Sequence, residues 1–238
     1  MLALFLIVLA ASATQGSTGF GFGLITMALL PLVVPLEVAS VVVTCDVVMI
    51  SLGMTWRLRH EVSLRLVMAP LSASIVLTPL GVYVLTVANE AILRIALGSL
   101  IVLLSLFLLL NGSERFQIAS TPRNGMIAGA TSGVMNGMFN IGGPPLVVYF
   151  MRTARDKLAY KAALDFVFLT GAIIRLFAVV LYGAVQSNAL PFVMVSLIAG
   201  GLGTLVGFGF FARIDRTMLS RAIHALLIAA GISLIITR

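Results

Sequence analysis

The chain has 238 residues, of which 61% are hydrophobic and only 10% are charged, and its mean hydropathy is +1.16. Soluble domains carry about 25% charged residues, so this composition predicts an integral membrane protein and leaves no room for a separate soluble domain. The net charge of +7 does not indicate nucleic-acid binding, because Lys and Arg occur in short loops between apolar runs. A single cysteine, Cys45, excludes an internal disulfide and a zinc or iron–sulfur site, and we expect no cofactor.

The first predicted element, residues 2–35, is a helical segment that contains a break. It is too long for one membrane span of about 20 residues, and each of its limbs is too short for a span of its own. Irregular backbone at membrane depth is tolerated only where it is buried in protein or lines a cavity. The break therefore predicts a binding site, and its candidate substrate ligands are Thr18, Gly19, Gly21 and Gly23.

Three spanning helices are expected after this element, and the same plan follows in the second half of the chain. The expected spans are residues 37–56, 66–87 and 91–110, and then 160–185, 189–212 and 217–237. A polar linker at 112–123 separates a first half, residues 1–111, from a second half, residues 124–238. Both halves belong to one predicted membrane domain that spans residues 1–238.

The second half opens on another broken element, residues 124–151, whose break is richer in sequence signals. Gly142 and Gly143 allow backbone conformations that other residues avoid, and Pro144 suits the first turn of a helix. A helix that begins there directs its positive end and its free N–H groups at the break, and such an end binds anions. The candidate substrate ligands here are Asn136, Gly137, Asn140, Gly142 and Gly143. The alternative is that these glycines and prolines only let helices cross closely.

The two breaks match each other in sequence, which predicts an internal repeat. Residues 14–34 align with 128–148 without gaps, at an offset of 145 − 31 = 114. Further along the chain, Asp46 matches Asp165 at an offset of 165 − 46 = 119. At an offset of 204 − 78 = 126, five more residues match, namely Thr78, Gly81, Leu93, Ala96 and Leu100 with Thr204, Gly207, Leu219, Ala222 and Leu226. Internal repeats of this type are typical of secondary transporters.

The loop charges predict that this repeat is inverted. Three loops are rich in Lys and Arg, at residues 57–65, 152–161 and 213–221. Since cytoplasmic loops carry such an excess, we place all three inside the cell. Counting spans from them makes residues 1–35 begin and end outside, whereas 124–151 begin and end inside. The two broken elements then enter from opposite faces as hairpins whose tips meet near the midplane, where secondary transporters bind substrate.

Three charged residues lie within the predicted spans. An acidic side chain at membrane depth is costly and indicates function by default, so Asp46 and Asp165 are candidates for proton coupling or gating. The structural alternatives are a hydrogen bond from hairpin backbone to Asp46 and an ion pair of Asp165 with Lys161. Arg175 needs an anionic partner, which is either one of these carboxylates or a substrate, and it is therefore also a candidate substrate ligand.

The break motifs, Gly16-Ser17-Thr18-Gly19-Phe20-Gly21-Phe22-Gly23 and Asn136-Gly137-Met138-Phe139-Asn140-Ile141-Gly142-Gly143-Pro144-Pro145, resemble those of the TauE/SafE family of sulfite exporters. The resemblance covers essentially the whole chain, including its duplicated plan. It implies a multi-pass permease of the bacterial inner membrane that moves small anions, notably sulfite, sulfonates and other organosulfur or carboxylate compounds.

We therefore expect an all-α polytopic membrane protein with an inverted-topology repeat, each half a re-entrant helical hairpin plus three transmembrane helices. The expected function is secondary transport of a small anion, with export by alternating access and protons as candidate coupling ions. The alternatives are an importer or a channel-like pathway for another small anion. A membrane enzyme is less favoured, because two His and one Cys offer no nucleophile–base set. A non-transporting subunit is a further, less favoured alternative. The expected partners are the anion and the lipid bilayer, with no nucleic acid, and the oligomeric state stays open.

Overall fold

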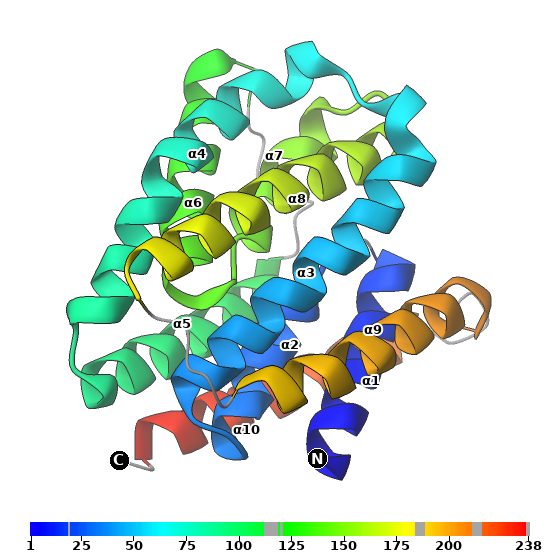
Figure 1. Cartoon of the computed structure of the whole chain (residues 1–238). Coiled ribbons are helices and arrows are strands. Elements are labelled where there is room, and N and C mark those ends of the chain that lie inside the picture. Colours follow the sequence, from blue (N-terminus) through cyan, green and yellow to red (C-terminus); the bar gives the residue numbers. More distant parts are fainter. Residues whose placement is uncertain (19, 112–118, 120, 184–188, 211–215, 237–238) are drawn as a thin grey trace.

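The computed structural model describes residues 1–18, 20–111, 119, 121–183, 189–210 and 216–236, with the backbone alone at 17, 18, 108, 110, 111, 208–210 and 216–223. Within these ranges every regular element is helical (Figure 1). The first half contains α1 (Leu2–Thr18), α2 (Phe22–Leu29), η1 (Leu30–Leu32), α3 (Leu36–Leu58), η2 (Arg59–Glu61), α4 (Leu64–Val87) and α5 (Glu90–Asn111). The second half contains α6 (Pro122–Phe139), α7 (Gly143–Thr153), α8 (Lys157–Leu181), α9 (Leu190–Phe210) and α10 (Arg216–Ile236).

Five of the described helices, α3, α4, α5, α8 and α9, are long and apolar enough to cross a membrane. The sixth expected span, 217–237, coincides with α10, whose side chains are described only from His224 onward. Each expected broken element is a pair of helices, α1 with α2 and α6 with α7. The prediction of an all-α polytopic membrane protein is confirmed, and so is the position of both breaks.

Local sequence explains where the second break begins and ends. Asn140 closes α6 in the left-handed conformation, with φ 57°, and its N–H donates to the Asn136 carbonyl at 2.9 Å. Asn and Gly are the residues that most often adopt this helix-ending geometry. After two further residues α7 begins at Gly143 with Pro144 in its first turn, which costs no intrahelical hydrogen bond. At the first break Gly21 precedes α2 with φ 106°, a conformation that favours glycine.

Small residues bring α6 against α4 and α1 against α9. A Cβ added at Gly129 of α6 would lie 2.0 Å from the Pro70 carbonyl oxygen of α4, and one at Gly137 would lie 2.2 Å from the Thr78 carbonyl oxygen. On the other side of the molecule, a Cβ at Gly207 of α9 would lie 2.3 Å from the carbonyl oxygen of Ala13. Backbones pack this closely in membrane proteins because helix association there depends on van der Waals contact. These contacts place the ends of α1 and α6 inside the molecule.

The two breaks lie 139 − 18 = 121 residues apart, so the gapless alignment of 14–34 with 128–148 is wrong by seven positions. That alignment paired Gly23 with Gly137, but Gly23 lies in the first turn of α2 whereas Gly137 lies inside α6 against α4. At the spacing of the two breaks Gly137 pairs with Gly16, whose added Cβ would lie 3.0 Å from the Thr204 carbonyl oxygen. The error arose because both kinds of glycine, at helix crossings and at helix breaks, look alike in an apolar sequence.

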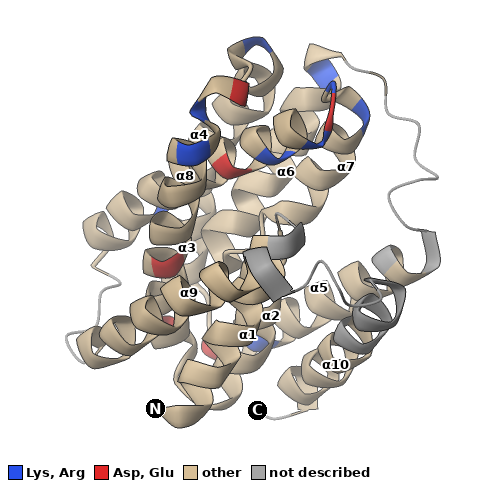
Figure 2. Ribbon diagram, turned by 90° about the vertical axis from the view of Figure 1, so that its right-hand side faces the viewer, with Lys and Arg blue, Asp and Glu red and all other residues tan. Residues whose placement is uncertain are grey.

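Figure 2 shows most of the described Lys and Arg gathered at one end of the molecule. This end includes the basic stretches 57–65 and 152–161, where α3 and α7 end and α4 and α8 begin. The third basic loop, 213–221, lies outside the described side chains. The charge pattern predicted that all three basic loops lie on one side of the membrane. The two that are described lie at the same end of the molecule, as predicted.

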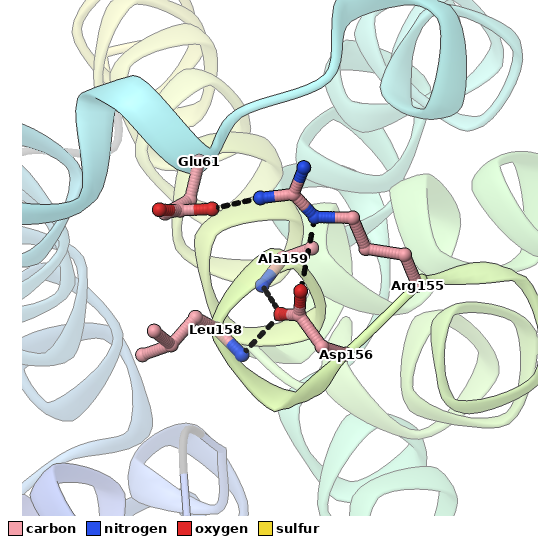
Figure 3. A network of polar contacts seen from close by, with 5 residues as sticks. All are labelled: Glu61, Arg155, Asp156, Leu158 and Ala159. Atoms are coloured by element: carbon pink, nitrogen blue, oxygen red, sulfur yellow. Dashed lines mark hydrogen bonds and ion pairs between the residues drawn. The ribbon is translucent and has the colours of Figure 1, made fainter.

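An ion pair joins the two described basic loops (Figure 3). Arg155 pairs with Glu61 of η2, and its Nε also contacts the Asp156 carboxylate at 2.9 Å. Asp156 caps α8 by accepting the N–H groups of Leu158 and Ala159 at 2.9 and 2.8 Å. The Ala159 N–H and the Arg155 charge hold the pKa of Asp156 below its ordinary value. The carboxylate is therefore charged at neutral pH, and it anchors the loop before α8 as well as the start of the helix.

Candidate functional site

The two helix breaks meet in the interior of the protein. A Cβ added at Gly23 would lie 2.0 Å from the Asn140 carbonyl oxygen, so the first turn of α2 lies directly against the end of α6. A cavity of about 30 Å³ lies at this contact. Both halves of the chain line it, through Gln15, Phe20, Gly21, Gly23, Leu24, Val47, Asn136, Asn140, Ile141, Gly142, Gly143, Pro144 and Phe168.

The N-termini of α2 and α7 both adjoin this cavity, but they offer different numbers of backbone donors. The first turn of a helix has N–H groups without intrahelical partners. In α2 these belong to Phe22, Gly23 and Leu24, and all three carry an N–H. In α7 the residues after Gly143 are Pro144 and Pro145, which carry none. The first break, which has the plainer sequence, therefore has the larger number of backbone donors.

The two asparagines of the second break have different surroundings. Asn136 lies three residues before the end of α6, and Gly171 of α8 leaves room for its amide, since a Cβ there would lie 3.2 Å from Nδ2. The amide of Asn140 is occupied by α3: its Nδ2 donates to the Ser40 carbonyl at 3.1 Å and contacts the Thr44 hydroxyl at 3.3 Å. Asn136 therefore has the freer amide, whereas Asn140 ties the break to α3.

Arg175 is fully buried, with 0% of its surface exposed, and its guanidinium joins three helices at the second break. Its Nε donates to the carbonyls of Asn136 and Gly137, at 2.9 and 3.1 Å, at the end of α6. Its Nη2 donates to the Ser40 hydroxyl at 2.7 Å, and its Nη1 bonds to the Thr44 hydroxyl of α3. A cation at a helix C-terminus is favoured by the helix dipole.

All these partners of Arg175 are neutral. Among the described residues no carboxylate lies within ion-pairing distance of its guanidinium, and the interpretation that Asp46 or Asp165 pairs with Arg175 is therefore wrong. Asp165 precedes Arg175 by ten residues on the same helix and faces a different direction. A buried charge normally has a counter-charge. The region behind the second break thus carries a positive charge that its described neighbours do not balance.

Lys161 has an equivalent place at the first break. Its Nζ donates to the Gly16 carbonyl at 2.9 Å, near the end of α1, just as Arg175 donates to Gly137 near the end of α6. Gly16 and Gly137 are 121 residues apart, the same distance as the two breaks. The single helix α8 therefore supplies a cation to the C-terminal end of both broken helices.

The two intramembrane aspartates are fully buried and are not among the residues that line the cavity at the breaks. Asp46 faces α9, where a Cβ at Gly200 would lie 3.2 Å from its Oδ1, and the Ser196 hydroxyl nearby donates to the Val193 carbonyl. Neither Asp46 nor Asp165 has a hydrogen-bond partner among the described residues, so the interpretation that hairpin backbone bonds to Asp46 is wrong. Lys161 lies close enough to Asp165 to attract it but forms no hydrogen bond with it.

The remaining candidate ligands divide into three groups. Gly21, Gly142 and Gly143 line the cavity, and the Gly142 carbonyl accepts a hydrogen bond from Ser132 at 2.7 Å. Gly137 faces α4 instead, so close helix crossing explains it, although its carbonyl meets Arg175. Gly19 and the Thr18 side chain lie outside the described parts of the structure.

Sequence reasoning missed two groups of polar residues at this site. Gln15 lines the cavity, and Ser40 and Thr44 hold the guanidinium of Arg175. One signal was available for Gln15: at the spacing of 121 residues it pairs with Asn136. Ser40 and Thr44 had no such signal, because single hydroxyl residues are common in membrane helices.

A larger hollow of about 690 Å³ lies between α5, α6 and α7 and shares Pro144 with the small cavity. Its lining is mainly apolar, through residues such as Leu100, Leu104 and Phe107. A small anion needs convergent donors, which the small cavity has and this hollow lacks. We therefore assign the candidate site to the small cavity.

Comparison with known proteins assigns the chain to a family. The profile of the family described as "Sulfite exporter TauE/SafE" matches residues 4–234. A protein of Cupriavidus necator, described as "Probable sulfite/organosulfonate exporter TauE", is 25% identical over 228 residues, which cover 93% of this chain and 88% of that protein. No solved structure matches the chain significantly. The resemblance found in the break motifs is thereby confirmed: this membrane transport protein, which is not an enzyme, belongs to the TauE/SafE sulfite exporter family.

Proposed function

We propose that this protein exports a small sulfur oxyanion, sulfite or an organosulfonate, across the bacterial inner membrane. The observation that carries the proposal is the buried charge of Arg175, which has no described carboxylate partner and lies directly behind the cavity where the two breaks meet. A bound anion supplies the missing counter-charge. The similarity to the probable sulfite/organosulfonate exporter of Cupriavidus necator supports the substrate class and the direction.

The anion is held mainly by neutral donors. The free N–H groups at the start of α2, the Gly143 N–H and the amide of Asn136 converge on the cavity. Helix N-termini bind anions because their N–H groups and dipole both favour negative charge. Arg175, which donates to a carbonyl at the end of α6, attracts the anion by its positive charge. Asn140 positions the break by its hydrogen bonds to α3.

Binding requires the two breaks to separate. A cavity of about 30 Å³ has room for a water molecule or two, which is less than an ion with a sulfur atom and three oxygens needs. In the proposed cycle the α1–α2 pair and the α6–α7 pair move apart and close again, and the anion is exposed to each side in turn.

The two halves, residues 1–111 and 124–238, form an inverted repeat in one membrane domain with 112–123 as the linker. Supporting this, α3 and α8 pack in opposite directions, since Arg175 reaches the start of α3 whereas Arg155, ahead of α8, reaches Glu61 beyond the end of α3. The pair α5 and α10 is also antiparallel: Gly98 lies against Leu234 and Val102 against Gly231. Helices related by an inverted repeat meet in this way at the axis between the halves.

Labelling of single cysteines tests the inverted arrangement. On a Cys45→Ala background, Val33→Cys and Tyr182→Cys are expected to react with a membrane-impermeant maleimide from the periplasmic side, because both lie at the end opposite the basic loops. His60→Cys, at the basic end, is the matched control and is expected to react only after the membrane is permeabilised. Labelling of Val33→Cys and Tyr182→Cys from opposite sides would rule out the inverted repeat.

Asp46 and Asp165 are the proposed proton carriers. Both carboxyl groups are buried in spanning helices without hydrogen-bond partners among the described residues. An ionised carboxylate is costly in such surroundings, and uptake of a proton removes that cost. Helix movements that change the exposure of these groups would therefore couple proton release to transport.

Flux of radiolabelled sulfite into proteoliposomes tests the proposed function. The wild-type protein is expected to carry saturable sulfite flux, whose initial rate changes when a pH gradient is imposed. Asn136→Ala removes one donor to the anion and is expected to raise KM about tenfold. Met126→Ala, an exposed residue of the same helix, serves as the matched control and is expected to leave KM unchanged.

Each arm of this experiment has its own negative result. Absence of sulfite or sulfonate flux by folded wild-type protein contradicts the proposed function. An unchanged KM in Asn136→Ala contradicts the site. The role of the two aspartates in proton coupling is contradicted if the wild-type flux rate does not respond to the pH gradient. It is also contradicted if Asp46→Asn and Asp165→Asn keep the wild-type response to the gradient.

A further inference from the structure

Gln15 has a buried side-chain amide that lines the candidate site and whose Nε2 has no acceptor among the described residues. It lies on α1, three residues before the helix ends, and only 3% of its surface is exposed. Its Nε2 finds no hydrogen-bond acceptor among the described residues, although it has two N–H groups to donate. The side chain lines the cavity of about 30 Å³ where the two breaks meet.

An unpaired amide at this position works against stability. A buried donor that lacks an acceptor has given up its hydrogen bonds to water without replacing them. Leucine or methionine would fill the same space without that penalty, and the neighbouring residues of α1 are largely apolar. The cost disappears when a ligand with acceptor atoms occupies the cavity.

Gln15 occupies the same place in the first broken helix as Asn136 does in the second. Asn136 also lies three residues before its helix ends, and the two residues are 136 − 15 = 121 positions apart, as are the breaks. The correspondence extends to other lining residues, since Phe20 pairs with Ile141 and Gly21 with Gly142 at the same spacing. The cavity therefore has one amide from each half of the chain.

We propose that Gln15 is a substrate ligand, whose Nε2 donates to one oxygen of the anion while Asn136 donates to another. This assignment rests on the proposed function, and it means that both halves of the chain donate to the anion. Two neutral amides, one from each half of the chain, select a ligand with at least two separate acceptor oxygens, which sulfite, sulfonates and carboxylates have and a halide lacks. They also bind without adding fixed charge, so that the ion can leave again once the breaks separate.

Gln15→Met tests the assignment, because methionine keeps the length of the side chain and removes both donors. The KM for sulfite in proteoliposomes is expected to rise about tenfold to a hundredfold, the loss that follows from one hydrogen bond to a charged group. The apparent melting temperature of the purified protein without substrate is expected to stay the same or to rise, because no described hydrogen bond is lost. Gln15→Asn, which keeps the amide but shortens its reach, is expected to fall between wild type and Gln15→Met.

Ser105→Ala is the matched control. Its hydroxyl on α5 is also fully buried without a described partner, but it lines neither hollow, and the substitution is expected to leave KM unchanged. The shift of melting temperature caused by added sulfite provides a second measurement: it is expected in wild type and Ser105→Ala, and to be lost in Gln15→Met.

The outcomes separate this assignment from the proposed function. The role of Gln15 is overturned, and the function is left standing, if wild type carries sulfite flux while Gln15→Met has the same KM and the same sulfite-induced shift of melting temperature as wild type. Wild-type protein that shows neither flux nor a shift with sulfite overturns the function, and the assignment falls with it. If Gln15→Met does not fold, then the amide has a structural role and the assignment is wrong, unless folded Gln15→Asn reproduces the rise in KM.

Discussion

Arg175→Met is expected to reduce sulfite flux by more than a hundredfold. A hydrogen bond to a charged group contributes about 1.5–3 kcal/mol, and each 1.4 kcal/mol corresponds to a factor of ten. Here the substitution removes the charge behind the cavity and leaves the Gly137 carbonyl without its described donor, whereas the Asn136 carbonyl keeps the Asn140 N–H. Flux is measured in proteoliposomes at equal amounts of folded protein, as judged by size-exclusion chromatography.

A second variant separates the charge of Arg175 from its geometry. Arg175→Lys keeps the positive charge but cannot bridge α3 and α6, because an ammonium group lacks the planar fork of the guanidinium. It is expected to retain a KM closer to wild type while its maximal rate falls. Arg59→Met, which removes an exposed cation, is the control and is expected to have no effect on flux. Wild-type KM and rate in folded Arg175→Met would show that the buried charge does not serve the anion.

Gly23→Ala is expected to disrupt the contact between the two breaks. The added Cβ would lie 2.0 Å from the Asn140 carbonyl oxygen, whereas real Cβ contacts are not shorter than about 3.0 Å, so the start of α2 must move away from α6. Overpacking of this kind costs about 1–3 kcal/mol, and more where the obstacle is backbone. We expect a melting temperature several degrees lower and a loss of sulfite flux of at least about tenfold, since the donors of α2 are displaced.

Gly53→Ala on α3 is the matched control for this substitution. A Cβ at Gly53 would meet nothing within 4 Å, and alanine favours a helix interior over glycine by about 0.5–1 kcal/mol. Gly53→Ala is therefore expected to melt at the same temperature as wild type or higher, with unchanged flux. Equal stability and flux in Gly23→Ala and Gly53→Ala would mean that the two breaks do not meet as described.

The positions of the helices and of their breaks could be predicted because local rules decide them. An apolar run of a given length forms a spanning helix wherever it occurs in a membrane chain. Asn140 and the Gly143-Pro144 pair end one helix and begin another through their own backbone preferences. Neither rule needs information about the rest of the molecule.

The partners of each helix could not be predicted, because they depend on surfaces that look alike in sequence. The glycines of α6 that cross α4 are indistinguishable in the sequence from the glycines of the break, and this led to an offset of 114 instead of 121. Arg175 illustrates the same limit: its acceptors lie 38 to 135 residues away, and they are neutral groups rather than the aspartates that charge alone suggested.

The sequence by itself therefore determined that this is a helical membrane protein with two broken helices, because hydrophobic length and the conformational limits of Gly, Pro and Asn act locally. Only the tertiary structure decided that the breaks meet, that Gln15 joins Asn136 at one cavity and that Arg175 stands behind it without a described counter-charge. These features arise from close backbone contacts between helices far apart in the chain, which depend on the complementary shapes of two surfaces.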